Sequence, residues 1–427
     1  MSELLAFYQK EADKQASNIA WLHAIQKAAI GDFAQLGFPT RFHEEWKYTT
    51  VDSFLKQPFT VSKSSQENRK GQASDFSIGL PIHLQHGIVL DAQDAWKESL
   101  PCGVVIEPLD KALVNHPDII QPYLNQVLPQ QHAFQALNTA MLHKGLFIYV
   151  PKGVSVPTPL YLSHWQDKEN EATYIRHLVV LEEESSACII EDYQGEPNRC
   201  YFTNAMSEVS LASGAHLTHY KVQRESKLAY HIGHLAVRQA AKSQLDSHSF
   251  SFGGGWVRSD MSVTLEGEKA RCLMNGVYLP SDSQHIDHHT LVTHQAPNCH
   301  SEQDYKGILS GHARAVFNGR VVVVKDAKQT DAKQQNKNIL LSAHSEIDTK
   351  PQLEIFADDV VCTHGATVGQ LDQDALFYLA SRGISHLDAV RYLVQAFTVD
   401  NLRLIGHAEL AEWLGHLMLD NDALAKT

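Results

Sequence analysis

Short apolar runs alternate with small, polar or acidic turns along most of the middle of the chain. The runs over 146–150, 160–162 and 178–181 are rich in β-branched and aromatic side chains. Runs of this length, bounded by Gly, Pro, Ser and acidic residues, predict β-strands. About 200 residues pass without a clearly helical segment, so the pattern favours a sandwich, a barrel, a propeller or a β-solenoid.

A weak internal repeat discriminates among these architectures. Similar runs begin at Val180, Val209, Leu235 and Val263, about 26 to 32 residues apart, with one longer gap over 282–306. Units of this size bury a hydrophobic face only when they stack on their neighbours. The repeat therefore predicts a parallel β-helix, with a sandwich as the second choice.

The N-terminal part of the chain has a different pattern. Apolar residues up to about residue 60 recur at helical spacing, and residues 62–75 have the Ser, Gln, Lys and Asn content of a surface linker. Trp46 and Tyr48 lie in a segment dense in aromatic and charged residues. We expect these two rings to pin the segment to the core.

Helical patterns return after residue 370. Asp372 or Asp374 is placed to cap a helix that ends at Gly383, and two further helices follow. A helical tail of this kind caps the open end of a solenoid, forms a docking surface, or does both. The predicted domains are an α-rich N-terminal region (1–140), a parallel β-helix core (141–369) and a C-terminal helical domain (370–427).

Composition narrows the function classes. The chain has 427 residues, of which 43% are hydrophobic and 20% charged, as in an ordinary globular protein. Its net charge of −13 disfavours binding to nucleic acid or to an anionic membrane through bulk electrostatics. The six cysteines form no CxxC pair, and neither a secretion signal nor a membrane-length apolar run is present. We therefore expect a cytoplasmic protein with reduced thiols.

The strongest candidate chemistry is the pair Cys362 and His364. In a strand, residues two apart face the same side with Cα atoms about 6.6 Å apart, so this thiol and imidazole would lie side by side. A soft sulfur and a borderline nitrogen suit iron, zinc or a nascent iron–sulfur cluster. The alternative is that Cys362 packs as a small apolar residue and His364 bonds to a backbone carbonyl.

A second candidate site is a histidine-rich stretch within the longer gap of the repeat. His285, Asp287, His289 and His294 are either a metal site or a row of exposed strand side chains in an inserted loop. Nucleotide hydrolysis is not expected, because the sequence contains no phosphate-binding G-x-x-x-x-G-K-[ST] loop. The glycines at 253–255 lack the lysine that such a loop requires.

Several stretches resemble signature sequences of the SufB/SufD family, whose members belong to the SufBCD iron–sulfur cluster assembly complex. These stretches are 37–41, 46–49, 315–319, 348–355, 362–369 and 377–384. The chain is more similar to the SufD branch than to the SufB branch. SufB-like proteins carry Glu-His-Glu-Ala where this chain has Cys362 to Ala366.

The resemblance implies a mainly β protein, a right-handed parallel β-helix between N-terminal and C-terminal helical regions. It implies pairing with SufB through the β-helix edge, with Cys362 and His364 at the shared interface where a cluster assembles. It also implies that the C-terminal helices bind SufC, the ATPase of the complex, so that this chain is not itself an enzyme. The apolar residues that we expect at that contact are Phe377, Tyr378, Leu379, Val390, Leu393 and Phe397.

In such a complex, iron or an iron–sulfur cluster would be held transiently, and we expect the isolated chain to bind no cofactor stably. The sequence leaves open whether a flavin binds the complex and whether the chain alone forms a homodimer. Three other functions also remain open from the sequence. They are a SufB-like scaffold, a histidine-based metalloenzyme, and a polysaccharide-processing β-helix enzyme using carboxylates such as Asp246, Asp260, Glu266 and Asp304.

Overall fold

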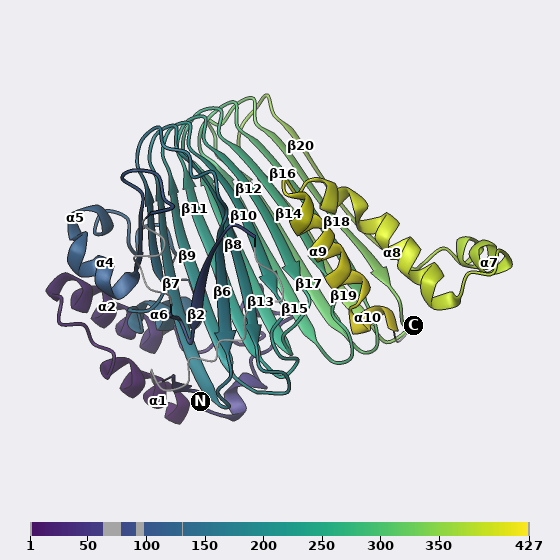
Figure 1. Cartoon of the computed structure of the whole chain (residues 1–427), viewed down its shortest axis with the longest axis horizontal. Helices are drawn as coiled ribbons and strands as arrows, with labels where there is room; N and C mark the ends of the chain where they lie inside the picture. Colours follow the sequence, from purple (N-terminus) through teal and green to yellow (C-terminus); the bar gives the residue numbers. More distant parts are fainter. Residues whose placement is uncertain (1, 63–77, 91–97, 130, 426–427) are drawn as a thin grey trace.

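The computed structural model describes residues 2–62, 78–90, 98–129 and 131–425. Nearly all of the predicted linker over 62–75 falls outside these ranges. The middle of the chain winds back and forth between two facing, mainly parallel sheets of ten strands each (Figure 1). Successive long strands belong alternately to one sheet and the other, which is the topology of a β-solenoid and confirms the predicted parallel β-helix.

From β5 onward, the odd-numbered strands form the first sheet. They are β5 (Leu146–Val150), β7 (Glu171–Leu181), β9 (Phe202–Leu211), β11 (Tyr230–Gln239), β13 (Trp256–Leu265), β15 (His285–His294), β17 (Arg314–Val323) and β19 (Glu346–Ile355). From β6 onward, the even-numbered strands form the second sheet. They are β6 (Leu160–Gln166), β8 (Ser186–Gly195), β10 (His216–Gln223), β12 (Gln244–Ser251), β14 (Arg271–Tyr278), β16 (His300–Leu309), β18 (Asp331–Leu340) and β20 (Val361–Gly369).

Four short strands from the N-terminal region extend these sheets. β2 (Leu80–Gln85) pairs with β6, and β3 (Ile88–Val89) pairs with β2. β4 (Val105–Pro108) pairs with β5, and β1 (Thr60–Val61) pairs with β7. The sheets therefore begin earlier in the chain than residue 141, in a region where helices interrupt the strand pattern.

Alternate residues of each strand point into the lumen, which we define as the side-chain-filled space between the inner faces of the two sheets. In-register pairing places like residues above one another in this space. One column of the first sheet consists of Val179, Val209, Val237, Val263, Val292 and Val321, all buried, and it ends at Leu353 on β19. Each layer of such a column buries its apolar face only because a neighbouring layer covers it.

One corner of the solenoid explains the regular turn that recurs in the sequence. Between a strand of the first sheet and the next strand of the second, one residue per turn has a left-handed backbone. These residues are Glu184, Gly214, Lys242, Lys269, Asn298, Gln329 and Asp359, with φ between 55° and 70°. The backbone N–H of each of the first six donates to a carbonyl one turn further along. The corner therefore continues the hydrogen-bond ladder of the sheets.

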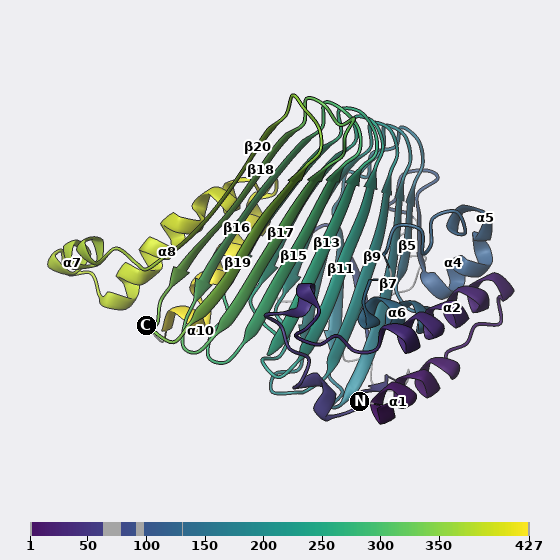
Figure 2. The same cartoon turned by 180° about the vertical axis from the view of Figure 1, so that it is seen from behind.

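The N-terminal helices cover the outer face of the first sheet (Figure 2). They are α1 (Ser2–Asp13), α2 (Ala20–Leu36), α4 (Leu109–Asn115), α5 (Pro117–Ile120) and α6 (Ala133–Ala140), with short 3-10 turns at Glu44–Trp46 and Phe54–Lys56. Phe54 packs edge-on against the outward-facing Phe202 of β9, with ring centroids 4.8 Å apart. Trp46 is buried as predicted, but Tyr48 is 40% exposed, so one ring anchors the segment rather than two.

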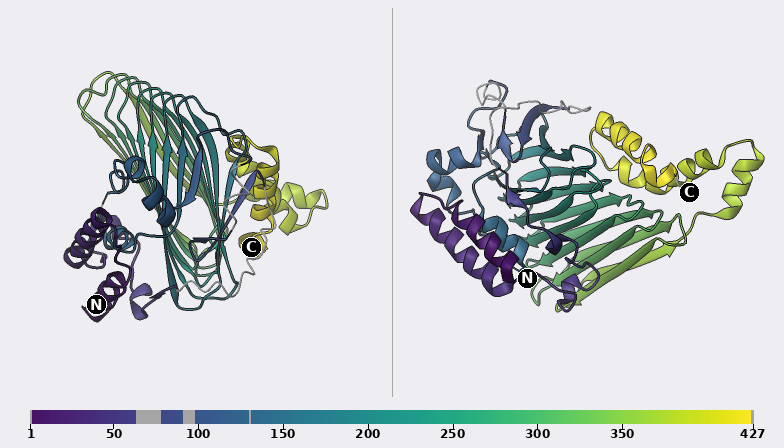
Figure 3. Two further views of the ribbon diagram at one scale, coloured as in Figure 1. Left: turned by 60° about the vertical axis from the view of Figure 1, so that its left-hand side comes forward. Right: turned by 90° about the horizontal axis from the view of Figure 1, so that it is seen from below.

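The C-terminal helices lie on the opposite side of the molecule, against the outer face of the second sheet (Figure 3). They are α7 (Gln373–Ser381), α8 (His386–Arg403), α9 (Ala408–Leu419) and α10 (Asp422–Ala425). Asp372 caps α7, and Gly383 follows it with φ 82°. Helices α8, α9 and α10 lie along the side of the solenoid and α7 extends beyond it, so the C-terminal helices do not cap its end. Within the described ranges, no helix combines the length and the apolar character needed to cross a membrane.

Candidate functional site at the open end of the solenoid

The last layer of the solenoid leaves the edges of both sheets unpaired. β19 pairs only with β17, and β20 pairs only with β18, within the described part of the chain. Both strands are ten or nine residues long, and Figure 2 shows them side by side at the end of the solenoid opposite the N-terminal helices. Unpaired edges of this length present backbone N–H and C=O groups that can add a further strand.

Register places Cys362 and His364 on the lumen side of β20. Cys362 pairs with Ala332, and His364 pairs with Gln334. Ala332 and Gln334 are each 1% exposed and face the lumen, so the two residues above them face the same way. No further layer covers β20, which leaves His364 exposed and Cys362 half-buried. The imidazole is thus accessible at the end of the solenoid although it sits on the inner face.

The Cys362 thiol is less accessible than the imidazole. It packs at the edge of a small apolar cluster that includes Val323, Ala332 and Ala357. Burial raises the pKa of this thiol, an effect that the hydrogen bond with the backbone of Ala332 opposes only in part. Because the thiolate is the form that binds metal, this burial disfavours the metal-binding form of Cys362.

An apolar rim surrounds this pair. The inward-facing residues of β19 are Ile347, Thr349, Pro351, Leu353 and Ile355, and those that follow His364 on β20 are Ala366 and Val368. Ile355, Phe356, Val361 and Val368 are 40%, 65%, 62% and 50% exposed. Ile355, Phe356 and Val361 lie on either side of the corner between β19 and β20, and exposed large apolar side chains that cluster in this way often mark an interface. The alternating apolar residues of β19 were visible in the sequence, but their exposure was not.

The histidine-rich stretch is a regular part of β15 and not an inserted loop. His285, Asp287 and His289 lie on the outer face of this strand, whereas His294 faces the lumen and bonds to Ser301 at 2.8 Å. The four predicted ligands are therefore split between two faces. In the described ranges, no group of three or more His, Cys, Asp or Glu side chains is arranged to hold a metal ion.

The three outward residues of this stretch hold the N-terminal segment instead. Thr49 Oγ1 donates to Asp287 Oδ2 at 2.6 Å and lies 2.8 Å from His285 Nε2. His289 lies between two carboxylates, 3.0 Å from Asp287 Oδ1 and 3.3 Å from Glu45 Oε2. Burial opposes protonation of His289, but the two carboxylates outweigh it and raise its pKa. The hydrogen bond from His289 lowers the pKa of Glu45.

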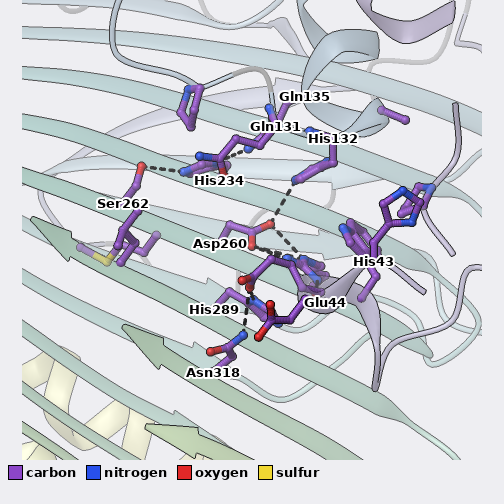
Figure 4. A pocket seen from close by; sticks show the side chains of 18 of the residues that line it. His43, Glu44, Gln131, His132, Gln135, His234, Asp260, Ser262, His289 and Asn318 are labelled. Atoms are coloured by element: carbon purple, nitrogen blue, oxygen red, sulfur yellow. Dashed lines mark hydrogen bonds and ion pairs between the residues drawn. The ribbon is translucent and has the colours of Figure 1, made fainter. Parts of the chain in front are cut away.

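A cavity of about 500 Å³ lies between this N-terminal segment, the start of α6 and the outer face of the first sheet (Figure 4). Its polar side chains mostly bond to one another. His234 accepts from Gln135 at 2.7 Å and lies 2.8 Å from Ser262 Oγ. Asn318 donates to Glu45 at 3.0 Å. These contacts stabilise the wall of the cavity.

Asp246 and Asp260, two of the four acidic residues considered for polysaccharide chemistry, do not form an acid–base pair. Asp246 lies on the second sheet, 2.8 Å from His216. Asp260 lies on the first sheet and accepts from Arg258 at 2.9 Å. Carboxylates that act together on a glycosidic bond must face one another across about 5 to 10 Å of one groove. These residues face outward from opposite sheets.

Comparison with known protein families identifies the chain. A family model described as "SUF system FeS cluster assembly, SufBD core domain" matches residues 164–397, and a second, "SufBD protein N-terminal region", matches residues 1–162. The chain belongs to the SufB/SufD family. It is 33% identical to the iron–sulfur cluster assembly protein SufD of Escherichia coli, over 91% of this chain and 88% of that protein.

Relatives from both branches of the SufB/SufD family are similar to this chain. The SufD protein of Bacillus subtilis is 27% identical over 91% of each chain. The SufB protein of the same organism is 29% identical over 83% of this chain and 75% of that protein. The solenoid and its helical flanks thus occur in a family whose named members assemble iron–sulfur clusters.

The C-terminal helices give this SufB/SufD-family chain a second exposed apolar surface. Phe377 and Tyr378 on α7 are 77% and 57% exposed, and Figure 1 shows α7 projecting beyond the solenoid. Leu379, Leu393 and Phe397 are half-buried. Val390 is 1% exposed, because that side of α8 packs on the second sheet. The structure thus places Val390 in the core and not on the docking surface expected from the sequence.

Proposed function

We propose that this chain is a non-catalytic subunit of an iron–sulfur cluster assembly scaffold. Family membership and the named roles of its relatives support the general role. The single observation that carries the site is the accessible imidazole of His364 on the last, unpaired strand, with the Cys362 thiol two residues away. Iron, sulfide or a nascent cluster is the cargo of this site, not a resident cofactor.

The proposed partner at this end is SufB, a paralogous β-helix protein. Its edge strands would pair with β19 and β20 and cover the exposed residues Ile355, Val361 and Val368. Contact of this kind would continue both sheets across the interface. One thiol and one imidazole are too few ligands for a cluster, so SufB would supply the remainder. An incompletely held cluster is suited to being passed on.

The proposed partner at the C-terminal helices is SufC, the ATPase of the complex. Phe377 and Tyr378 offer the exposed aromatic surface for it. α8 connects this surface to the solenoid, because Lys306 of β16 donates to the Phe397 carbonyl at 2.8 Å and Asn275 of β14 donates to the Asn401 carbonyl at 3.1 Å. Movement of SufC during ATP hydrolysis would therefore be transmitted to β14 and β16, which are separated from β20 at the open end by β18.

Replacement of His364 tests the site. His364→Ala should leave the fold and the capture of SufB and SufC intact, while the iron and sulfide content of the co-expressed complex falls at least about tenfold, as expected for loss of a metal ligand. Cys362→Ala tests the thiol in the same assay. His344→Ala is the matched control, because His344 is also exposed but lies in the turn between β18 and β19. Wild-type cluster content in His364→Ala would remove this residue from the mechanism.

A further inference from the structure

A column of polar side chains stands in the lumen directly beneath His364. Strand register places Gln303 of β16 opposite Gln334 of β18, and Gln334 opposite His364 of β20. Gln303 and Gln334 are both 1% exposed, whereas His364 is exposed at the top of the column. In-register stacking of amides at the spacing between strands lets each side chain hydrogen-bond to the next one.

The hydrogen bonds in this column give the Gln334 amide a direction. Gln303 Oε1 accepts from the Thr290 hydroxyl at 2.7 Å and from Gln334 Nε2 at 3.3 Å. With Gln303 in this orientation, a flipped Gln334 amide would set two carbonyl oxygens against each other, so the nitrogen of Gln334 lies on the Gln303 side. Gln334 Oε1 and Gln303 Nε2 are then both buried and without a hydrogen-bond partner among the described residues. An unsatisfied buried acceptor is costly and rare in native proteins.

A glycine on the opposite sheet makes room for this amide. A Cβ atom built on Gly319 of β17 would lie 2.2 Å from Gln334 Nε2, much closer than non-bonded atoms approach. Residue 319 has no side chain, and this leaves the space that the end of the Gln334 side chain occupies. The position of the amide under β20 is in this way set by three strands, β16, β17 and β18.

We propose that Gln334 is a positioning residue for His364. The His364 imidazole, turned onto the layer below, donates one ring N–H to Gln334 Oε1. A neutral imidazole has one N–H and one nitrogen with a lone pair, so this hydrogen bond fixes the tautomer. The lone pair of the other nitrogen is then available to bind iron at the open end. Metal-binding histidines are commonly oriented by such a second hydrogen bond. This inference rests on the proposed function of His364.

The chain offers a matched pair of glutamines for the test. Gln334 faces the lumen, whereas the adjacent Gln335 is exposed on the outer face. Gln334→Met removes the acceptor with little change in length, Gln334→Glu retains an acceptor, and Gln335→Met is the control. The tautomer of His364 is read from the ¹⁵N chemical shifts of histidine-labelled full chain, with its signals assigned by their absence in His364→Ala.

We expect one dominant His364 tautomer in the wild type, in Gln334→Glu and in Gln335→Met, and a mixture of the two in Gln334→Met. The rate of cluster formation in the complete complex should fall about tenfold in Gln334→Met only. If Gln334→Met leaves both the tautomer and the rate unchanged while His364→Ala abolishes assembly, the positioning role is wrong and the proposed function stands. If His364→Ala also assembles normally, the proposed function itself fails.

Discussion

The guanidinium carbon of Arg258 lies 4.0 Å from the centroid of the Trp46 ring, which joins β13 to the N-terminal segment. Arg258 also donates to Asp260 at 2.9 Å and to the Glu45 carbonyl at 2.6 Å. Arg258 and Trp46 are 2% and 3% exposed. A buried arginine between an aromatic face, a carboxylate and a backbone carbonyl fixes the segment over the outer face of the first sheet.

Trp46→Ala should therefore detach this segment. The expected loss in the free energy of unfolding is about 3–5 kcal/mol, the range for removing a buried large aromatic side chain. Chemical denaturation measures this loss, and faster tryptic cleavage at Arg41 and Lys47 reports the detachment. Tyr48→Ala is the control, because Tyr48 is 40% exposed, and it should cost less than about 1 kcal/mol. Equal losses in the two variants would contradict the single-anchor description.

Phe377→Ala and Tyr378→Ala should each weaken binding of SufC. Exposed aromatic residues at the centre of an interface often contribute about 2 kcal/mol or more, which corresponds to roughly thirtyfold in Kd. Biolayer interferometry on the full chain measures the change. Phe42→Ala is the matched control, since Phe42 is 85% exposed but lies in the N-terminal segment. Unchanged affinity in both α7 variants would exclude this helix as the docking surface.

The histidines buried in the lumen make the fold sensitive to acid. His288 lies against Tyr278 and Tyr305, with ring centroids 5.2 and 5.6 Å away, and 3.3 Å from Ser251 Oγ. Burial lowers its pKa to about 4, an effect that Asp287 opposes. An unfolded histidine has a pKa near 6.5, so between about pH 6.5 and pH 4 the unfolded chain binds a proton that the folded chain does not. Stability should fall as the pH is lowered through this range.

His288→Gln should reduce that dependence. The slope of unfolding free energy against pH should decrease between pH 6.5 and 4 by up to about 1.4 kcal/mol per pH unit, the value for one proton. Denaturant titrations at several pH values measure the slope for each protein. Gln335→Met, at an exposed position on β18, changes no ionisable group and should retain the wild-type slope. A wild-type slope in His288→Gln would show that this imidazole does not titrate differently on folding.

Local sequence pattern was sufficient for the architecture. The apolar runs predicted the strands, and their spacing predicted a stacked parallel coil, because each layer buries its hydrophobic face only against the next layer. The pattern predicted Asp372 or Asp374 as the cap of the first C-terminal helix and Gly383 as its stop, and the structure has Asp372 as the cap and Gly383 just after the helix. Such signals depend on residues that are close in the chain.

Alternation along a strand also predicted that Cys362 and His364 lie on one face of β20. It did not predict whether that face points into the lumen or outward. Register with β18 decided that the pair points into the lumen, and the absence of a further layer decided that His364 is accessible. The same limit explains the histidine-rich stretch. Spacing could not reveal that His294 faces the lumen while His285 and His289 face the N-terminal segment.

The sequence by itself thus determined the strands and their stacking, because these follow from contacts between neighbours along the chain or between successive repeats. Its signature stretches also indicated the family. Only the tertiary structure decided which side chains are covered. Coverage depends on contacts between different strands and segments, such as Thr49 beside Asp287, which are 238 residues apart, or Gly319 of β17 beside Gln334 of β18. The accessible imidazole at the open end and the amide beneath it exist only once those distant segments have packed.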